Sequence, residues 1–251
     1  MNDKDIQLAQ RLSNLIKSDH RPASLTASIS APTVNIARIN ISLLKAMLDL
    51  LHKQGIFVTI DRPHQYAEHL LRIHNIDFSK LTFIDMISAY AGDRKVGFKE
   101  WTNSHGPFSL GDILDLIKLS NAAKESLYVD LLQIDFILFD NIGSLLVYNR
   151  ADSVKRFLGQ LMEQVKKTSG IFVAFVIDPR NYADLFDDVN SRSDICIEIG
   201  QDMSILDVHD TGCIGEAAHS SSQVASKVAL MNRGEFNETN TVQDKIWNPR
   251  I

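Results

Sequence analysis

Cysteines and long apolar runs are both scarce in this chain. Only 2 of its 251 residues are cysteines, Cys196 and Cys213, so we expect no disulfide framework and two reduced thiols. No apolar run reaches the roughly 20 residues needed to span a bilayer, and the first ten residues, MNDKDIQLAQ, are too polar for a signal peptide. These absences predict a cytoplasmic protein without membrane contact.

Positive charge is also in short supply. The chain has 26 Lys and Arg against 31 Asp and Glu, a net charge of −5. A global basic field that would attract nucleic acid is therefore excluded, and we expect no nucleic-acid partner. Its 45% hydrophobic and 23% charged residues are typical of a globular protein, and its length suits one α/β domain with or without an appendage.

Four short apolar segments are each followed directly by an aspartate: Asp61, Asp85, Asp140 and Asp178. Segments that are apolar throughout are typical of parallel strands buried on both faces. The carboxyl ends of parallel strands meet at one edge, where α/β proteins bind ligands. The pattern predicts an edge that carries several carboxylates, although each Asp would also suit a helix cap or a turn.

Strand-like and helix-like segments alternate along most of the chain, which predicts an α/β fold with a mostly parallel central sheet between helical layers. We expect an amphipathic N-terminal helix within residues 1–20, a main domain over residues 22–200, and a short extension with a weakly ordered C-terminal tail over residues 201–251. A helix over residues 41–54 is predicted to stop at Gly55. The expected strands cover residues 25–30, 56–60, 81–84, 134–139, 171–177 and 194–199.

Three segments of this domain resemble the RecA superfamily of P-loop ATPases, and its KaiC-like branch most closely. Residues 55–63, GIFVTIDRP, are similar to a strand that normally ends in two catalytic glutamates. Residues 74–85 are similar to a conserved segment of that branch, and residues 135–145, DFILFDNIGSL, resemble its Walker B strand and turn. The resemblance covers residues 22–200 and implies a RecA-like three-layer αβα fold.

The segment that should be the phosphate loop departs from the family pattern. A Walker A loop, G-x-x-x-x-G-K-[ST], uses glycines to curl backbone N–H groups around phosphate and a lysine to contact it. Residues 30–40, SAPTVNIARIN, contain no glycine and no lysine, and Pro32 lacks a backbone donor. Since Asp61 also stands alone where the family has two glutamates, we expect no ordinary ATP hydrolysis.

These observations favour a non-hydrolysing KaiC/RecA-like protein, a pseudo-ATPase that acts as a regulatory or protein-binding module. We expect no cofactor and no assured catalytic residue, with Asp61 and Asp140 as vestigial candidates. A protein partner is expected. A homo-oligomer is compatible with the resemblance, because RecA relatives assemble head to tail.

Two alternatives remain open from the sequence. In the first, the chain is an ATP-binding ATPase with an atypical loop, in which Thr33, Arg38 and Asp85 contact the nucleotide and Asp140 holds Mg²⁺. In the second, it is a nucleic-acid accessory factor that uses the basic and aromatic residues within 94–101 for stacking and phosphate contact.

Overall fold

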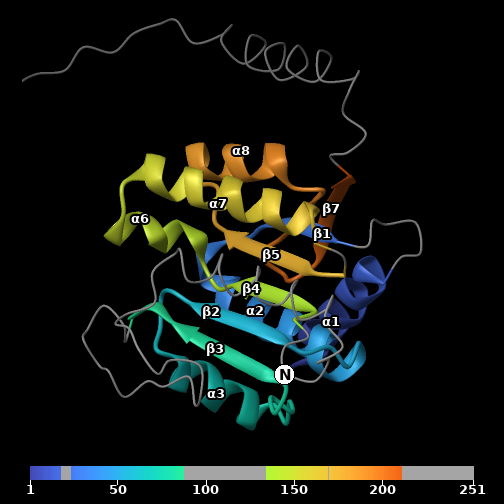
Figure 1. The fold of residues 1–251 in the computed structure, drawn as a ribbon. Helices are drawn as coiled ribbons and strands as arrows, with labels where there is room; N and C mark the ends of the chain where they lie inside the picture. The colour runs from blue at the N-terminus through green and yellow to red at the C-terminus, as the bar shows by residue number, and fades with distance from the viewer. Residues whose placement is uncertain (18–23, 88–133, 169, 211–251) are drawn as a thin grey trace, which may run out of the picture. The chain divides into compact units, whose positions relative to one another are not determined.

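Seven strands form one sheet in the part of the chain that this computed structural model describes, residues 1–17, 24–87, 134–168 and 170–210 (Figure 1). The strands are β1 (Leu25–Ser30), β2 (Gly55–Thr59), β3 (Leu81–Asp85), β4 (Phe136–Phe139), β5 (Phe172–Ile177), β6 (Ile195–Ile199) and β7 (Ile205–Asp210). Their order is β3-β2-β4-β5-β1-β6-β7. All neighbours pair in parallel except β6 and β7, which confirms the predicted, mostly parallel sheet.

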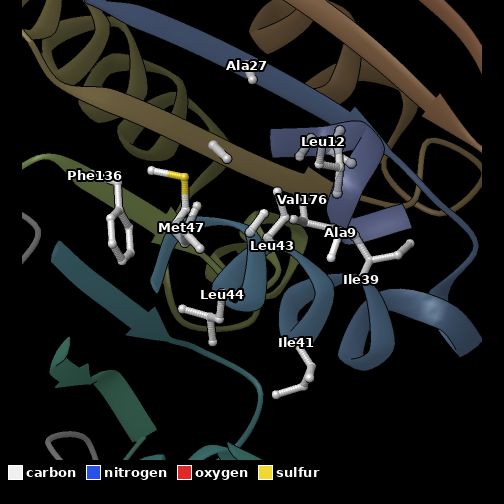
Figure 2. Close-up of a cluster of buried hydrophobic side chains, with 14 of the residues drawn as sticks. Ala9, Leu12, Ala27, Ile39, Ile41, Leu43, Leu44, Met47, Phe136 and Val176 are labelled. Carbon is white, nitrogen blue, oxygen red and sulfur yellow. The ribbon is translucent and has the colours of Figure 1, made fainter. Parts of the chain in front are cut away.

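Helices cover both faces of the sheet and bury two separate cores. One face carries α1 (Asp3–Ile16), α2 (Ile36–Lys45), the π-helical turn η2 (Ala46–Leu50) and α3 (His64–Ile73). The other carries α6 (Leu145–Tyr148), α7 (Ala151–Lys166) and α8 (Ala183–Arg192). Figure 2 shows how Leu43 and Met47 of the first face pack near Phe136 and Val176 of the sheet. The three-layer αβα architecture expected from the sequence is therefore present.

The N-terminal helix α1 packs on α2 through one apolar stripe. It begins with a capping box, in which Asn2 Oδ1 accepts from the Asp5 N–H at 2.9 Å and Asp5 Oδ2 accepts from the Asn2 N–H at 3.3 Å. Leu8, Ala9 and Leu12 are fully buried. The amphipathic pattern thus serves the domain's own core. No helix among the described residues is long and apolar enough to cross a membrane.

The predicted helix over residues 41–54 was wrong at both ends. α2 begins at Ile36, because a 3-10 turn, η1 (Thr33–Asn35), follows β1 closely and leads directly into the helix. At the other end the helix passes through η2, and His52 takes a positive φ of 54°. Gly55 lies in β2 and does not cap the helix.

The sequence also predicts a long loop over residues 86–108 and a helix over residues 109–124, and most of the loop and all of the helix lie outside the described residues. The basic and aromatic segment within residues 94–101 and the tail beyond residue 210 lie outside them too. Cys213 lies there too, whereas Cys196 is a free, buried thiol in β6 whose pKa is raised by burial. Residues 205–210 form β7, the strand that pairs with β6.

Gly55 is required because β4 passes very close to it. A Cβ at this position would lie 2.3 Å from the carbonyl oxygen of Phe136 and 2.6 Å from its ring. Gly55→Ala should therefore lower the free energy of unfolding by about 2 kcal/mol, measured by urea denaturation.

Gly159→Ala is the matched control for this substitution. The nearest atom to its new Cβ is the end of the flexible Arg192 side chain, and alanine is the better helix former within α7. We expect it to leave stability unchanged or to raise it by up to about 1 kcal/mol. Equal losses in the two variants would contradict the close-approach explanation.

Candidate functional site

The four strand-end aspartates lie along the carboxyl edge of the sheet. Asp85 ends β3, Asp61 follows β2, Asp140 follows β4 and Asp178 follows β5, and these four strands are neighbours in that order. Because the strands are parallel, the side chains share one edge. The residues around this edge form the candidate site.

A pocket of about 80 Å³ opens at this edge between α2 and α3. We call it the α2–α3 pocket. Its polar lining comes from Thr33, Asn40, Thr59, Asp61, Arg62, Tyr66 and Asp140, and its apolar lining from Ile36, Ala37, Ile41, Phe57, Pro63, Ala67 and Leu70. The pocket therefore combines a polar lining with an apolar wall that comes mainly from the two helices.

Asp140 links the end of β4 to the end of β2. Its side chain is buried, and its two carboxylate oxygens accept from the backbone N–H groups of Ile60 at 2.9 Å and Asp61 at 3.2 Å. Burial, together with the negative charge of Asp61, raises the pKa of Asp140 to about 7. Asp61 itself accepts from the Asn141 side-chain amide at 2.8 Å.

Asn40 reaches the same place from the first turns of α2. Its Nδ2 donates to the backbone carbonyl of Asp140 at 3.0 Å, and the residue is only 5% exposed. Its Oδ1 is buried and accepts no hydrogen bond from any described residue. Asn40 was not among the site residues predicted from the sequence, although a polar residue on the buried face of an apolar helix is a signal in its favour.

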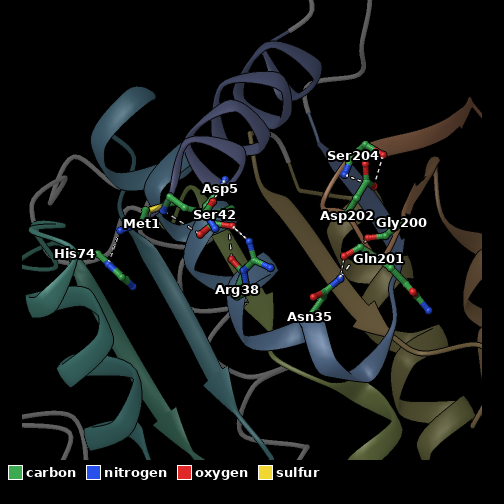
Figure 3. A network of polar contacts seen from close by, with 11 residues as sticks. Met1, Asp5, Asn35, Arg38, Ser42, His74, Gly200, Gln201, Asp202 and Ser204 are labelled. Atoms are coloured by element: carbon green, nitrogen blue, oxygen red, sulfur yellow. Dashed lines mark hydrogen bonds and ion pairs between the residues drawn. The ribbon is translucent and has the colours of Figure 1, made fainter.

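Hydrogen bonds to residues after β5 and β6 occupy the donors of the connection between β1 and α2. The Thr33 N–H and hydroxyl both donate to Asp178 Oδ2, at 2.8 and 2.7 Å. The Asn35 side-chain amide donates to the carbonyls of Gln201 at 2.9 Å and Gly200 at 3.3 Å (Figure 3). These contacts hold η1 against the loops that follow β5 and β6.

Asp178 remains ionised at this connection. Arg180 donates to its carboxylate through Nε at 2.9 Å and Nη2 at 2.7 Å, and Thr33 adds two more donors. The Arg180 contact, followed by those of Thr33, holds the pKa of Asp178 well below its usual range. An internal anion thus sits at the turn that leads into α2.

The structure brings together some of the predicted site residues and separates others. Thr33, Asp61 and Asp140 line the α2–α3 pocket, whereas Arg38 and Asp85 do not. Arg38 Nη2 pairs with Asp5 Oδ1 of α1 at 2.6 Å (Figure 3). Asp85 accepts from the His64 N–H at 2.8 Å, and its Oδ2 lies 2.8 Å from His64 Nδ1.

The described residues offer few ligands for a metal ion at this site. Within the described ranges, no group of three or more His, Cys, Asp or Glu side chains is placed to hold one. Each carboxylate oxygen of Asp140, the predicted Mg²⁺ ligand, already accepts a backbone N–H. A carboxylate oxygen that accepts one N–H keeps a second lone pair, so the role of Asp140 as a Mg²⁺ ligand stays a prediction.

Comparison with known proteins shows similarity at the level of the fold. No family model and no curated protein matches the sequence. A KaiC-like protein, PH0186, from the hyperthermophilic archaeon Pyrococcus horikoshii OT3 matches with a TM-score of 0.51 and 9% identity, over 74% of this chain and 76% of its own. An uncharacterized protein, PH0321, from Pyrococcus horikoshii, solved in complex with an unknown peptide, matches with a TM-score of 0.54 and 13% identity, over 77% and 85%. The fold of this chain is therefore RecA-like, as in KaiC-like proteins.

Proposed function

We propose that this chain is a KaiC/RecA-like protein that does not hydrolyse nucleotide and that acts as a regulatory or protein-binding module. The observation that carries the proposal is the closed connection between β1 and α2. There the Thr33 N–H and hydroxyl donate to the Asp178 carboxylate.

A nucleotide needs free donors and positive charge at this connection. Phosphates bind where backbone N–H groups at a helix start point outward, usually next to a lysine. Here an ionised carboxylate accepts the Thr33 N–H, so an internal anion takes the donor that a phosphate would use. Arg38, the nearest candidate cation in the sequence, pairs with Asp5 instead.

The charges of the α2–α3 pocket also oppose a triphosphate. The charged Asp61 lines it beside Asp140, whose pKa is raised to about 7, and like charges about 4 Å apart repel by about 4 kcal/mol at an effective dielectric constant of 20. The ATPase alternative predicts Thr33, Arg38 and Asp85 at the nucleotide and Asp140 at Mg²⁺, and of these four residues Thr33 and Asp140 line this pocket. Arg62, the cation that lines the pocket, is placed over the Tyr66 ring, 4.7 Å from the ring centre, and not beside these carboxylates.

Two observations support a protein-binding role. Val34 of η1 is 82% exposed, and Tyr66 of α3, which lines the α2–α3 pocket, is 41% exposed, so both offer apolar surface that a protein partner would cover. In addition, PH0321, which has the same fold, was solved with a peptide bound. A regulatory protein that binds a segment of a partner would use such a surface.

Mg·ATP should neither stabilise this protein nor be hydrolysed by it. A ligand at 100 times its Kd adds about 2.7 kcal/mol to the free energy of unfolding, so thermal melting with millimolar Mg·ATP is a sensitive measurement. We expect no rise in Tm and no phosphate release above the buffer blank. A rise in Tm, or phosphate release that Asp140→Asn abolishes, would overturn the proposal in favour of the ATPase alternative.

A further inference from the structure

One residue that lines the α2–α3 pocket has a buried acceptor without a donor. Asn40 lines the pocket and is 95% buried, and its Oδ1 receives no hydrogen bond from any residue in the described part of the chain. Its own amide is held in place by the Asp140 carbonyl at 3.0 Å. A buried polar atom without a partner is unfavourable, and a ligand that supplies the donor would remove that penalty.

The charged groups around Asn40 are also acceptors. Asp61 and Asp140 line the pocket, and neither forms an ion pair with a Lys, Arg or His of the described ranges. Arg62 lies at the pocket, yet its guanidinium is placed over the Tyr66 ring, 4.7 Å from the ring centre. The site thus offers the charged Asp61, the buried carboxyl of Asp140 with its pKa of about 7, and an amide oxygen to a group that carries donors and a positive charge.

The apolar wall limits which cation fits. It is formed by Ile36, Ala37 and Ile41 of α2, Phe57 of β2, and Ala67 and Leu70 of α3. Mg²⁺ keeps several of its waters when bound and would place them against this wall. A volume of about 80 Å³ is also far below the roughly 300–1,000 Å³ of pockets that enclose drug-sized ligands.

We propose that the α2–α3 pocket binds a primary alkylammonium group, the chemistry of a lysine side chain. An ammonium has three donors and no acceptor, which matches Asn40 Oδ1 and the carboxylates of Asp61 and Asp140. Its alkyl stem would pack on the apolar wall between α2 and α3. The inference rests on the proposed function, since it gives the protein-binding module a residue type that a partner inserts.

Titration of the ¹⁵N-labelled full chain, followed by NMR, tests this inference. The probes are n-butylammonium and its neutral counterpart n-butanol. We expect n-butylammonium to shift the Asn40 side-chain amide signal in a saturable way, and n-butanol to give at least tenfold weaker binding. Equal binding of the two probes, or no saturable shift with n-butylammonium, would overturn the inference.

A second pair of probes identifies the source of the ammonium group. The peptide Ac-Gly-Lys-Gly-NH₂ is compared with the same peptide carrying norleucine in place of lysine. Saturable binding of the lysine peptide alone supports a lysine side chain of a partner. Binding of n-butylammonium without the lysine peptide supports a free alkylamine as the ligand of the same pocket.

Substitutions locate the binding at the pocket. Asp61 accepts from the Asn141 amide, and Asp61→Asn keeps that acceptor while removing the charge, so we expect at least threefold weaker binding of n-butylammonium. Asp152→Asn, an exposed change in α7 on the other face of the sheet, should leave binding unchanged. Equal effects in the two variants would overturn the assignment of amine binding to this pocket.

A parallel titration with Mg·ATP separates the two proposals. Nucleotide binding would contradict the proposed function, whereas a lack of amine binding would contradict only this inference.

Discussion

Asp140→Asn is expected to stabilise the protein above pH 7 and to remove part of its pH dependence. The pKa of Asp140 rises from 3.8 to about 7 in the folded protein because the carboxyl is buried beside the charge of Asp61. Between these values the folded state holds a proton that the unfolded state releases, so the free energy of unfolding falls as pH rises from about 4 to about 7. Three pKa units correspond to about 4 kcal/mol over that window.

The asparagine in this variant carries no charge at any of these pH values. Its Oδ1 can still accept from the Ile60 N–H, whereas its Nδ2 would face the Asp61 N–H, a mismatch that costs about 1–2 kcal/mol. The variant should therefore be less stable than the wild type near pH 4 and more stable near pH 8. The difference between the two should change by about 4 kcal/mol across the range.

Urea denaturation at intervals from about pH 4 to about pH 8 measures this difference directly. Since other titrating groups are common to both proteins, their contributions cancel in the comparison. Asp152→Asn, which removes an exposed charge from the first turn of α7, provides the control and should give a nearly constant difference from the wild type. If the difference in the free energy of unfolding between Asp140→Asn and the wild type is also constant with pH, the pKa of Asp140 is not raised by folding and the prediction is wrong.

The strands of this fold were predictable because their signal is local. Strands β2, β4 and β5 are short, almost wholly apolar runs, which predict burial on both faces without knowledge of their neighbours, whereas β1, LTASIS, was predicted from its alternation. β1 and β5 end where the sequence indicates, at Ser30 and Ile177. Since every such strand ends at the same edge, the placement of the four aspartates followed from the pattern as well.

The start of α2 was not predictable in the same way. Residues 30–40 were predicted to be a loop, because a Walker A loop would occupy that place. In the structure, the three-residue turn η1 leads directly into α2, which begins at Ile36. The shift changes which side chains face the site. With α2 beginning at Ile36, Arg38 pairs with Asp5 of α1, and Asn40 lines the pocket.

The interpretation of the aspartates as caps describes most of their contacts. Asp85 accepts from the N–H of His64, the first residue of α3. Asp140 and Asp178 each accept backbone N–H groups from neighbouring turns. Asp61 does not act as a cap, because its carboxylate accepts a hydrogen bond from the Asn141 side chain. Asp61 is also exposed, and it lines the pocket. Asp61 is thus the acid at this edge that is most accessible to a ligand.

Asp178→Ala is expected to lower the free energy of unfolding by about 3 kcal/mol. The substitution leaves the Thr33 N–H and hydroxyl without their acceptor and releases Arg180. The pKa of Asp178 is depressed in the folded state, so its contribution is present above the unfolded value of 3.8 and is lost as pH falls below it. The difference between wild type and variant, measured by urea denaturation, should therefore shrink below about pH 4.

Asp202→Ala is the matched control, because Asp202 also accepts from a backbone N–H and a hydroxyl, both of Ser204, but in an exposed turn. Asp202→Ala should lower the free energy of unfolding by no more than about 1 kcal/mol. A loss as small in Asp178→Ala would mean that the carboxylate of Asp178 does not hold the β1–α2 connection in place.

Asp178→Ala also tests whether this carboxylate is what excludes nucleotide, since the variant frees the Thr33 N–H without adding a glycine or a lysine. If it still binds no Mg·ATP, a missing phosphate nest and cation are sufficient to exclude nucleotide. If it gains binding, the internal carboxylate is what excludes it.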